Sequence, residues 1–221
     1  MKGGCAVQLF LASTSPARLA TLRAAGIEPV VVPSEVDEDA VVAAAEASGG
    51  ALSPADMVLL LARAKAEAVV NEVAASASGD ALILGGDSAF VIDGEIFGKP
   101  HTAERASARW HAHRGRTGQL FSGHWLIRLG NGNEVAQAGE VAVADVTFVE
   151  DITDDEIAAY VASDEPLKVA GAFTIDSLGS AFIETISGDP STVVGVSVPT
   201  VRRLTRELGV FWPDLWNRNR A

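Results

Sequence analysis

The feature that most constrains this chain is an apolar segment near its amino terminus that runs directly into a helix start. Residues 8–12 have the pattern of a strand, and Ser15 followed by Pro16 is typical of a helix N-cap with proline at the first helical position. Gly26 provides the stop for that helix. A strand that leads into a helix N-terminus leaves unpaired backbone N–H groups at one point, with the positive end of the helix dipole behind them.

Three side chains add hydrogen-bond donors to this junction. Ser13, Ser15 and Arg18 lie within six consecutive positions around the helix start. Together with the backbone N–H groups they would form an anion-binding corner. Capped strand–helix junctions are also common where no ligand binds, so a plain junction is the alternative.

The composition limits the kind of ligand that such a corner would bind. The chain has 221 residues and a formal net charge of −12, which argues against a protein that coats nucleic acid or binds an anionic membrane surface. A local cluster of Lys and Arg or a bound metal still allows a phosphate-bearing small ligand. No uncharged apolar run approaches the length of a membrane span, no segment is organised as a signal peptide, and the single cysteine, Cys5, excludes an internal disulfide. We therefore expect one cytoplasmic domain, residues 1–221, without membrane or polymeric nucleic acid as partners.

A second apolar run leads to an acidic residue. Residues 81–86 are continuously apolar, as in a buried central strand, and Asp87 follows them. We expect this carboxylate at the carboxyl end of the strand, where α/β sheets place ligand chemistry. Asp93-Gly94 predicts a hairpin turn that returns Lys99 toward Asp87. The two residues form either a cross-strand ion pair or a base or metal ligand beside a phosphate donor.

The longest helix pattern begins at the N-cap candidate Ser53 and runs to about Ala75. Lys65 follows Leu61 by four residues and shares its inward-leaning face. This lysine either extends along the helix toward solvent or reaches a ligand. We expect the apolar stripe of the helix to consist of Met57, Leu60, Leu61, Ala64 and Ala68.

The remaining patterns give an α/β domain with a mixed sheet. Residues 34–39 are a carboxylate-rich loop in which Glu38 is either solvated or engaged with a metal or a lysine. An alanine-rich segment over residues 40–48 is a helix candidate that Gly49-Gly50 would end. We expect strands over 28–33 (short and buried), 119–129, 135–149 and 180–186, and helices over 102–114, from 153 onward and over 199–208.

The polar residues singled out in these segments fall into two sets. The donors suited to phosphate oxygens are Ser13, Ser15, Arg18, Lys65, Lys99 and Arg116. The carboxylates suited to Mg²⁺ are Glu38 and Asp87. Since the chain has no P-loop and no dinucleotide-binding glycine motif, these sets indicate nucleotide hydrolysis outside the common ATPase classes.

A series of short motifs in a fixed order carries a family resemblance over nearly the whole chain. The motifs are Leu11–Arg18, Val36–Glu38, Leu61–Ala66, Gly86–Ser88, Gly98–Pro100, Gly115–Thr117, Ala170–Asp176, Val193–Gly195 and Pro199. In these the sequence resembles the Maf family of nucleoside triphosphate pyrophosphatases, also called septum-formation inhibitor Maf-like proteins. Each motif alone is weak, but the set in this order is specific.

The resemblance implies an elongated α/β fold related to the inosine-triphosphatase enzymes, with a mixed sheet flanked by helices and two lobes around a cleft. It implies a homodimer. It also implies hydrolysis of a nucleoside triphosphate to the monophosphate and pyrophosphate with Mg²⁺ or Mn²⁺, which would clear modified or excess nucleotides.

Carried over by position, the resemblance matches Asp87 to the general base and places Asp176 where the family varies with base specificity. It matches Ser13, Arg18, Glu38, Lys65 and Lys99 to the other site residues. Joined with the donor and carboxylate sets above, it gives Asp87 and Lys99 as the catalytic residues and Glu38 and Asp87 as the metal ligands. The substrate-binding set is Ser13, Ser15, Arg18, Lys65, Arg116 and Asp176. We expect the Ser13–Arg18 corner and Asp87 to face one cleft and to bind a single polyphosphate between them.

The chain departs from the family pattern at four positions. Ala17 stands where many members have the first of two arginines, so one phosphate contact is missing or comes from elsewhere. Ser88 replaces a threonine, and Gly118 replaces a common histidine. Asp176 is neither the glutamine of the dTTP/UTP-cleaving branch nor the glutamate of the 7-methyl-GTP branch, which leaves the preferred base open.

Two other functions remain open at this stage. One is a nucleotide-binding regulator of cell division and septum formation that hydrolyses little, which fits the missing arginine at Ala17. The other is a nucleotidyltransferase, which shares the phosphate and metal chemistry but needs an acceptor other than water.

Overall fold

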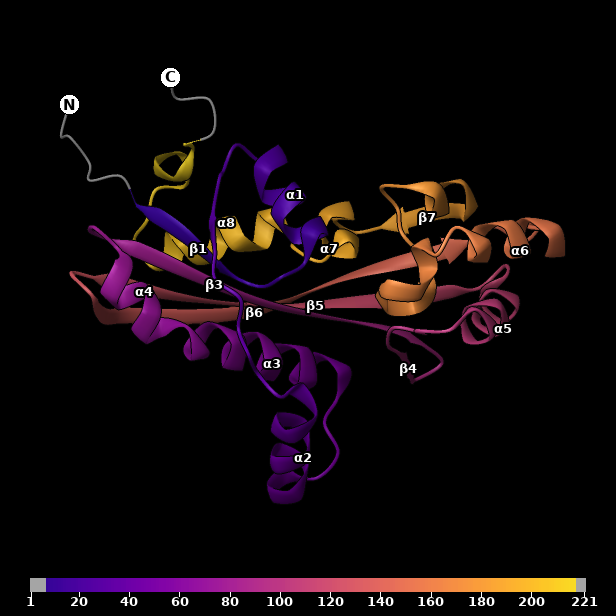
Figure 1. Ribbon diagram of the computed structural model, residues 1–221, viewed down its shortest axis with the longest axis horizontal. Helices are drawn as coiled ribbons and strands as arrows, with labels where there is room; N and C mark the ends of the chain where they lie inside the picture. Colours follow the sequence, from indigo (N-terminus) through magenta and orange to yellow (C-terminus); the bar gives the residue numbers. More distant parts are fainter. Residues whose placement is uncertain (1–6, 218–221) are drawn as a thin grey trace. The chain divides into compact units, whose positions relative to one another are not determined.

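The computed structural model describes residues 7–217, which form an α/β fold around a seven-stranded mixed sheet (Figure 1). The strand order is β2-β1-β3-β5-β6-β7, with β4 paired to β3. β1 is parallel to both β2 and β3, whereas β4 is antiparallel to β3 and β7 is antiparallel to β6. The expected class, a mixed sheet flanked by helices, is therefore confirmed. Cys5 lies outside the described residues.

The elements along the chain are a mixture of strands, α-helices and short 3₁₀ helices. The strands are β1 (Gln8–Ala12), β2 (Val30–Val31), β3 (Ala81–Ile92), β4 (Glu95–Phe97), β5 (Thr117–Gly130), β6 (Asn133–Phe148) and β7 (Ile183–Ser187). The α-helices are α1 (Pro16–Ala24), α2 (Glu38–Gly49), α3 (Pro54–Ala68), α4 (Val70–Ser76), α5 (Ala103–His113), α6 (Asp154–Ala162), α7 (Pro190–Val194) and α8 (Val198–Glu207). Short 3₁₀ helices are η1 (Glu165–Lys168), η2 (Ala170–Ala172), η3 (Leu178–Phe182) and η4 (Trp212–Leu215). In the described part of the chain, no helix combines the length and the apolar character that crossing a bilayer requires.

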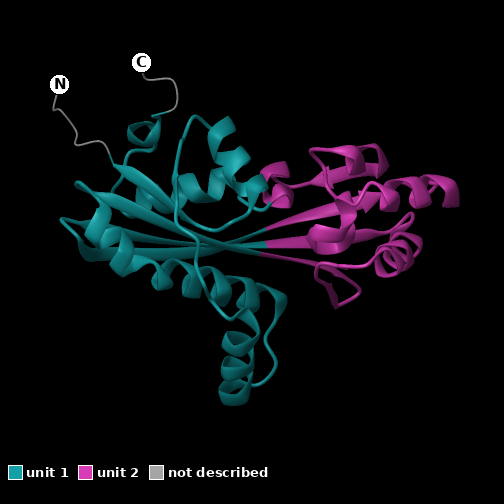
Figure 2. Ribbon diagram, in the orientation of Figure 1, with its two compact units in different colours: residues 1–87, 122–142, 195–221 teal, residues 88–121, 143–194 magenta. Residues whose placement is uncertain are grey.

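The described residues divide into two compact units (Figure 2). Unit 1 contains residues 7–87, 122–142 and 195–217, and unit 2 contains residues 88–121 and 143–194. The long strands β3, β5 and β6 contribute residues to both units. Each unit has its own hydrophobic core.

The core of unit 1 has two layers because the side chains of a strand alternate between its faces. In Figure 1, α1 and α8 cover one face of the β1 and β3 region, and α3 and α4 cover the other. The layer that includes α1 and α8 contains Leu9, Leu11, Leu22, Leu82, Leu84, Val201 and Leu204. The layer that includes α3 and α4 contains Phe10, Ala12, Ala66, Val69, Val73, Ala81 and Ile83.

The core of unit 2 is aromatic and holds an irregular backbone segment in place. Trp110 of α5 is fully buried, and its indole Nε1 donates a hydrogen bond to the carbonyl of Ala172 at 2.8 Å. His113, one turn further along α5, has its Nε2 3.1 Å from the carbonyl of Gly171. Gly171 and Ala172 have φ angles of +71° and +64°, so this segment turns sharply at a point that α5 secures.

The local signals for caps and turns are confirmed. Ser15 is the N-cap of α1 and accepts a hydrogen bond from the backbone N–H of Arg18, and Gly26 follows α1 with a φ of +86°. Asp93 and Gly94 both have positive φ in the turn between β3 and β4. Thr153 forms the expected capping box of α6.

Several element boundaries differ from expectation. The strand expected over 28–33 is wrong in extent and burial, because β2 spans only Val30 and Val31 at the edge of the sheet and both side chains are exposed. The carboxylate-rich loop is shorter than expected, since α2 begins at Glu38 with Asp37 as its N-cap. The helix expected over 53–75 is interrupted at Val69 between α3 and α4.

Two further differences matter for the site. The buried face of α3 consists of Val58, Leu61, Ala62, Lys65 and Ala66, so of the expected stripe only Leu61 is buried. The buried face of α3 is therefore rotated relative to the expected stripe, so that Ala62 and Ala66 lie against Gly85 of β3. The buried strand does not stop at Asp87, which lies within the twelve residues of β3.

We predict that His113 makes the stability of the fold depend on pH. Burial lowers the pKa of its imidazole from 6.5 to about 4, and the hydrogen bond to the Gly171 carbonyl only partly opposes this shift. The unfolded chain therefore takes up a proton below pH 6.5 that the folded chain takes up only near pH 4, so the free energy of unfolding falls as the pH is lowered through this window. The loss should reach about 3 kcal/mol for this single group.

Urea unfolding of the wild type and of His113→Gln at intervals from pH 8 to pH 4 measures the effect. The difference at pH 8 gives the packing cost of the substitution, and this difference should shrink or reverse toward pH 4 because glutamine does not titrate. Parallel curves for the two proteins over the whole range would show that His113 does not contribute.

Candidate active site

Two adjacent glycines in the middle of β3 allow helices to approach the strand closely. A Cβ atom at Gly85 would lie 2.0 Å from the carbonyl oxygen of Ala62 and 2.8 Å from the backbone nitrogen of Ala66. The backbone of α3 therefore packs directly on the strand at a distance that only glycine permits. A Cβ atom at Gly86 would lie 3.3 Å from the Nε of Arg18, so the side chain from α1 rests on the strand there.

The close packing of α3 brings a lysine onto Asp87. Gly85 and Asp87 point to the same face of β3 because they are two residues apart, and Lys65 lies between Ala62 and Ala66 on the buried face of α3. Lys65 Nζ donates a hydrogen bond to Asp87 Oδ1 at 2.7 Å. The two side chains are only 10% and 12% exposed, so this is a buried ion pair.

A second carboxylate meets the same ammonium group. Glu38 is the first residue of α2, whose N-cap Asp37 accepts a hydrogen bond from the backbone N–H of Ala40 at 3.0 Å. Glu38 Oε1 lies 2.7 Å from Lys65 Nζ, and its side chain is 50% exposed. Of the alternatives left open for Glu38 and Lys65, the structure shows a lysine that pairs with two carboxylates.

The hydroxyl-rich corner lies at the N-terminus of α1, as its sequence predicts. Ser13 is buried, and its Oγ accepts hydrogen bonds from the backbone N–H of Ser15 at 3.2 Å and from Arg18 Nη1 at 3.1 Å. Arg18 Nε donates to the carbonyl of Gly195 at 2.9 Å. Since both contacts to Ser13 are donated to its oxygen, its own hydroxyl hydrogen can be donated to an anion.

The charges of these groups are electrostatically coupled. Burial raises the pKa of Asp87, while the positive charges of Lys65 and Arg18 act in the opposite direction. Burial also lowers the pKa of Arg18, and the negative charges of Asp87 and Glu38 oppose that effect. The structure therefore brings Ser13, Ser15, Arg18, Glu38, Lys65 and Asp87 together within unit 1.

The three other residues expected at the site belong to unit 2. Lys99 is exposed and lies beyond β4, which ends at Phe97. Arg116 forms an exposed ion pair with Asp93 of the β3–β4 turn. Asp176 is exposed. Their participation in substrate binding or catalysis stays a prediction.

A carboxylate that the sequence reasoning missed organises the segment that carries Asp176. Glu165 accepts five hydrogen bonds, donated by Tyr160 Oη, Thr174 Oγ1, Ser177 Oγ and the backbone N–H groups of Leu178 and Gly179. Burial on its own would raise the pKa of Glu165, but these hydrogen bonds outweigh it and lower the pKa to about 2. The only sequence hint was an acid next to a proline, which is too common to single out.

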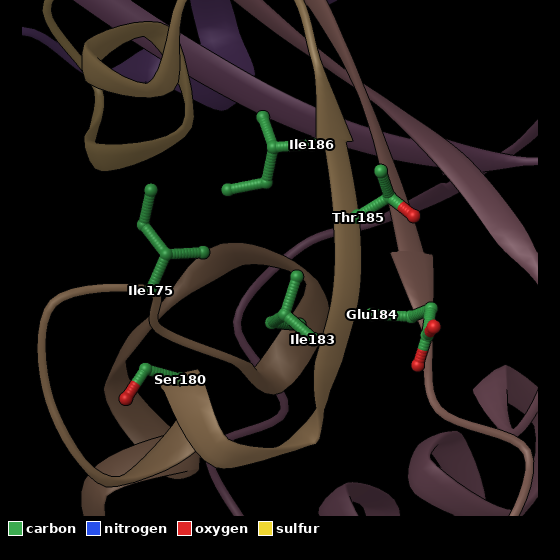
Figure 3. Close-up of a pocket in the computed structure, with 6 residues that line it drawn as sticks. All are labelled: Ile175, Ser180, Ile183, Glu184, Thr185 and Ile186. Carbon is green, nitrogen blue, oxygen red and sulfur yellow. The ribbon is translucent and has the colours of Figure 1, made fainter.

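The same segment borders an open hollow in unit 2 (Figure 3). Its volume is about 220 Å³, and three isoleucines, Ile175, Ile183 and Ile186, point into the same space. Ser180, Glu184 and Thr185 complete the lining. None of the residues of the unit 1 cluster contributes to it, so the hollow is a separate feature.

The donor set in unit 1 fits a divalent cation shared with a phosphate ligand. Glu38 Oε1 and Asp87 Oδ1 are each 2.7 Å from one nitrogen atom, so the two carboxylates converge on one point, as the ligands of a shared ion must. Mg²⁺ is characteristically held by one or two carboxylates and completes its shell with water and substrate phosphates. No group of three or more His, Cys, Asp or Glu side chains converges within residues 7–217, so a cage built only from protein side chains is not formed there.

Comparison with known proteins identifies the family. The profile of the family described as Maf-like protein matches residues 8–208, and this chain therefore belongs to that family. A protein of Leifsonia xyli subsp. xyli, named nucleoside triphosphate pyrophosphatase, is 63% identical over 96% of this chain and 98% of its own length. Proteins with the same name from Nocardia farcinica and Rhodococcus jostii are 49% and 48% identical over 94% and 93% of this chain, and over 96% and 94% of their own lengths.

We predict that a single methyl group at position 85 disturbs the site. Gly85→Ala should lower the free energy of unfolding by about 1–3 kcal/mol, because its Cβ would overlap the backbone of α3. Gly49→Ala is the matched control, since nothing lies within 4 Å of a Cβ there and the residue is helical.

Urea denaturation of both variants at pH 7.5 measures the effect. Gly49→Ala should show no loss of stability. Wild-type stability of Gly85→Ala would contradict the close packing of α3 on β3.

Proposed function

We propose that this chain hydrolyses nucleoside triphosphates to the monophosphate and pyrophosphate. The observation that carries the proposal is the buried Asp87 carboxylate, which lies beside Lys65 and under the electrostatic influence of Arg18. A base adjoining cations that can bind phosphate is the arrangement such a reaction requires. The names of the relatives favour the same reaction over a regulator with little catalysis.

In this proposal Asp87 is the general base. Its carboxylate orients a water molecule and accepts the proton as that water attacks the α-phosphorus. Burial raises the pKa of Asp87 toward the range in which a carboxylate accepts a proton more readily. The bond between the α-phosphorus and the bridging oxygen breaks, and pyrophosphate leaves.

The phosphate oxygens are bound by the corner at α1 and by Lys65. Ser13 and Ser15 contribute hydroxyl groups, and Arg18 and Lys65 contribute charge that stabilises the leaving pyrophosphate. We propose the same role for Arg116, a second catalytic role for Lys99, and a contact that selects the base for Asp176. Arg18 lies against Gly86, so one phosphate-binding arginine is present at the corner although residue 17 is alanine.

We propose that Glu38 and Asp87 hold the Mg²⁺ or Mn²⁺ ion. Such an ion, when bound, neutralises phosphate charge and polarises the attacking water. The Glu38 side chain can change its position to bind the ion, because it is half exposed and lies in the first turn of α2, a helix with no buried residue.

The biological setting is proposed on the family resemblance. We propose that residues 1–221 act as one domain, that the chain forms a homodimer, and that it clears modified or excess nucleotides in the cytoplasm. The clearing of nucleotides depends on the proposed hydrolysis, whereas the single domain, the homodimer and the cytoplasmic location are independent of it.

We predict that hydrolysis in ¹⁸O-water labels the monophosphate and leaves the pyrophosphate unlabelled, because water attacks the α-phosphorus. Normal and modified triphosphates are incubated with the protein and Mg²⁺ or Mn²⁺, and products are separated and analysed by mass spectrometry. Label in pyrophosphate would move the attack to another phosphorus. Absence of hydrolysis across the panel, with nucleotide binding retained, would favour the regulator. Turnover that requires an added acceptor would favour the nucleotidyltransferase.

We also predict that Asp87→Asn reduces kcat by about 100-fold or more, because the amide cannot accept the proton. Asp151→Asn, an exposed residue outside the cluster, is the control and should keep wild-type turnover. Thermal melting monitors the fold of both variants. A folded Asp87→Asn variant with wild-type kcat would remove Asp87 from the mechanism.

A further inference from the structure

The ammonium group of Lys65 contacts two carboxylates at the same time. Its ammonium nitrogen is 2.7 Å from Glu38 Oε1 and 2.7 Å from Asp87 Oδ1. These are the two side chains that the proposed function assigns to the divalent cation. A single ammonium group therefore contacts both of the proposed metal ligands.

We propose that Lys65 competes with the divalent cation for the Glu38 and Asp87 carboxylates, and so sets how tightly this chain binds the cation. The inference rests on the proposed function, because it takes these carboxylates as the metal ligands. It adds that Lys65 limits the affinity for the ion as well as binding phosphate.

Competition follows from the limited space around the two oxygen atoms. Mg²⁺ binds oxygen ligands at about 2.0–2.1 Å, closer than the 2.7 Å of the ammonium contacts. An ion shared by the same two oxygens would lie against the ammonium nitrogen, and like charges at such a distance repel strongly where little water screens them. Lys65 must then give up at least one of its two contacts.

The surroundings of the cluster indicate which contact is lost more easily. Lys65 and Asp87 are held by the tight packing of α3 on Gly85, and both side chains are almost fully buried. Glu38 is half exposed, and α2 has no buried residue to fix it. The contact between Lys65 and Glu38 is therefore the weaker of the two. A Lys65 ammonium released from it keeps its long flexible stem and can turn toward phosphate oxygens.

Competition and a purely structural role of Lys65 predict opposite effects of its removal on cation binding. If Lys65 only held the carboxylates in place, its removal would leave cation binding unchanged or weaker. If Lys65 competes, its removal makes cation binding tighter. Removal of any nearby positive charge would also tighten binding through the general field, so a control must remove an equal charge that does not touch the carboxylates.

The test uses the full chain without nucleotide and measures Mn²⁺ binding by isothermal titration calorimetry at pH 7.5. Lys65→Met should bind Mn²⁺ about tenfold or more tightly than the wild type. Lys65→Arg keeps a positive charge and should bind no more tightly than the wild type. Arg63→Met is the matched control: Arg63 lies two residues away on α3, is exposed, and pairs with Glu67. It should bind within twofold of the wild type.

Weaker or unchanged Mn²⁺ binding by Lys65→Met would overturn the proposal, as would equal tightening by Lys65→Met and Arg63→Met. If Lys65→Met folds poorly, thermal melting with and without Mn²⁺ gives the same comparison. Mn²⁺ should then raise the Tm of Lys65→Met more than that of the wild type, and an equal or smaller rise would contradict competition. Pyrophosphate release by the wild type is measured separately, so failure of the proposed function and failure of this inference are distinguishable.

Discussion

The absence of side chains at Gly85 and Gly86 is the constraint on which the candidate site depends. A methyl group at Gly85 would overlap the backbone of α3, and one at Gly86 would press on Arg18. Because both positions are glycine, Lys65 from α3 and Arg18 from α1 come close to one short stretch of β3. Asp87 follows directly, so a buried carboxylate lies next to two cations without any loop being needed to carry them.

The close approach also makes the charges interdependent. Lys65 is buried and is stabilised by Asp87 and Glu38, while burial of Asp87 works against its ionisation. Breaking one partner of a buried pair leaves an uncompensated charge, which is generally far more costly than losing a surface pair. Any charged ligand or ion that binds there therefore changes the electrostatic balance among Lys65, Asp87 and Glu38.

Unit 2 shows a different way of fixing a segment without regular secondary structure. The backbone around Gly171 and Asp176 is irregular, and its order comes from side chains elsewhere in the same unit. Trp110 and His113 bind the carbonyls of the sharp turn, and Glu165 collects five hydrogen bonds from the residues around it. These bonds hold an exposed loop in one conformation, and loops held on a rigid scaffold are common positions for binding residues.

Short sequence patterns are enough to predict the cap at Ser15, the turn at Asp93-Gly94, the α/β class and the family, because each of these depends on residues close together in the chain. The same patterns do not show that β3 continues through Asp87, that Ala62 and Ala66 of α3 pack against Gly85, or that Lys65 contacts Glu38 and Asp87 together. These features depend on the distance between backbones that are far apart in sequence. The periodicity of a sequence indicates which face of a helix is apolar. Only the packing of α3 on β3 shows that the lack of a Cβ at Gly85 allows Lys65 to contact Asp87.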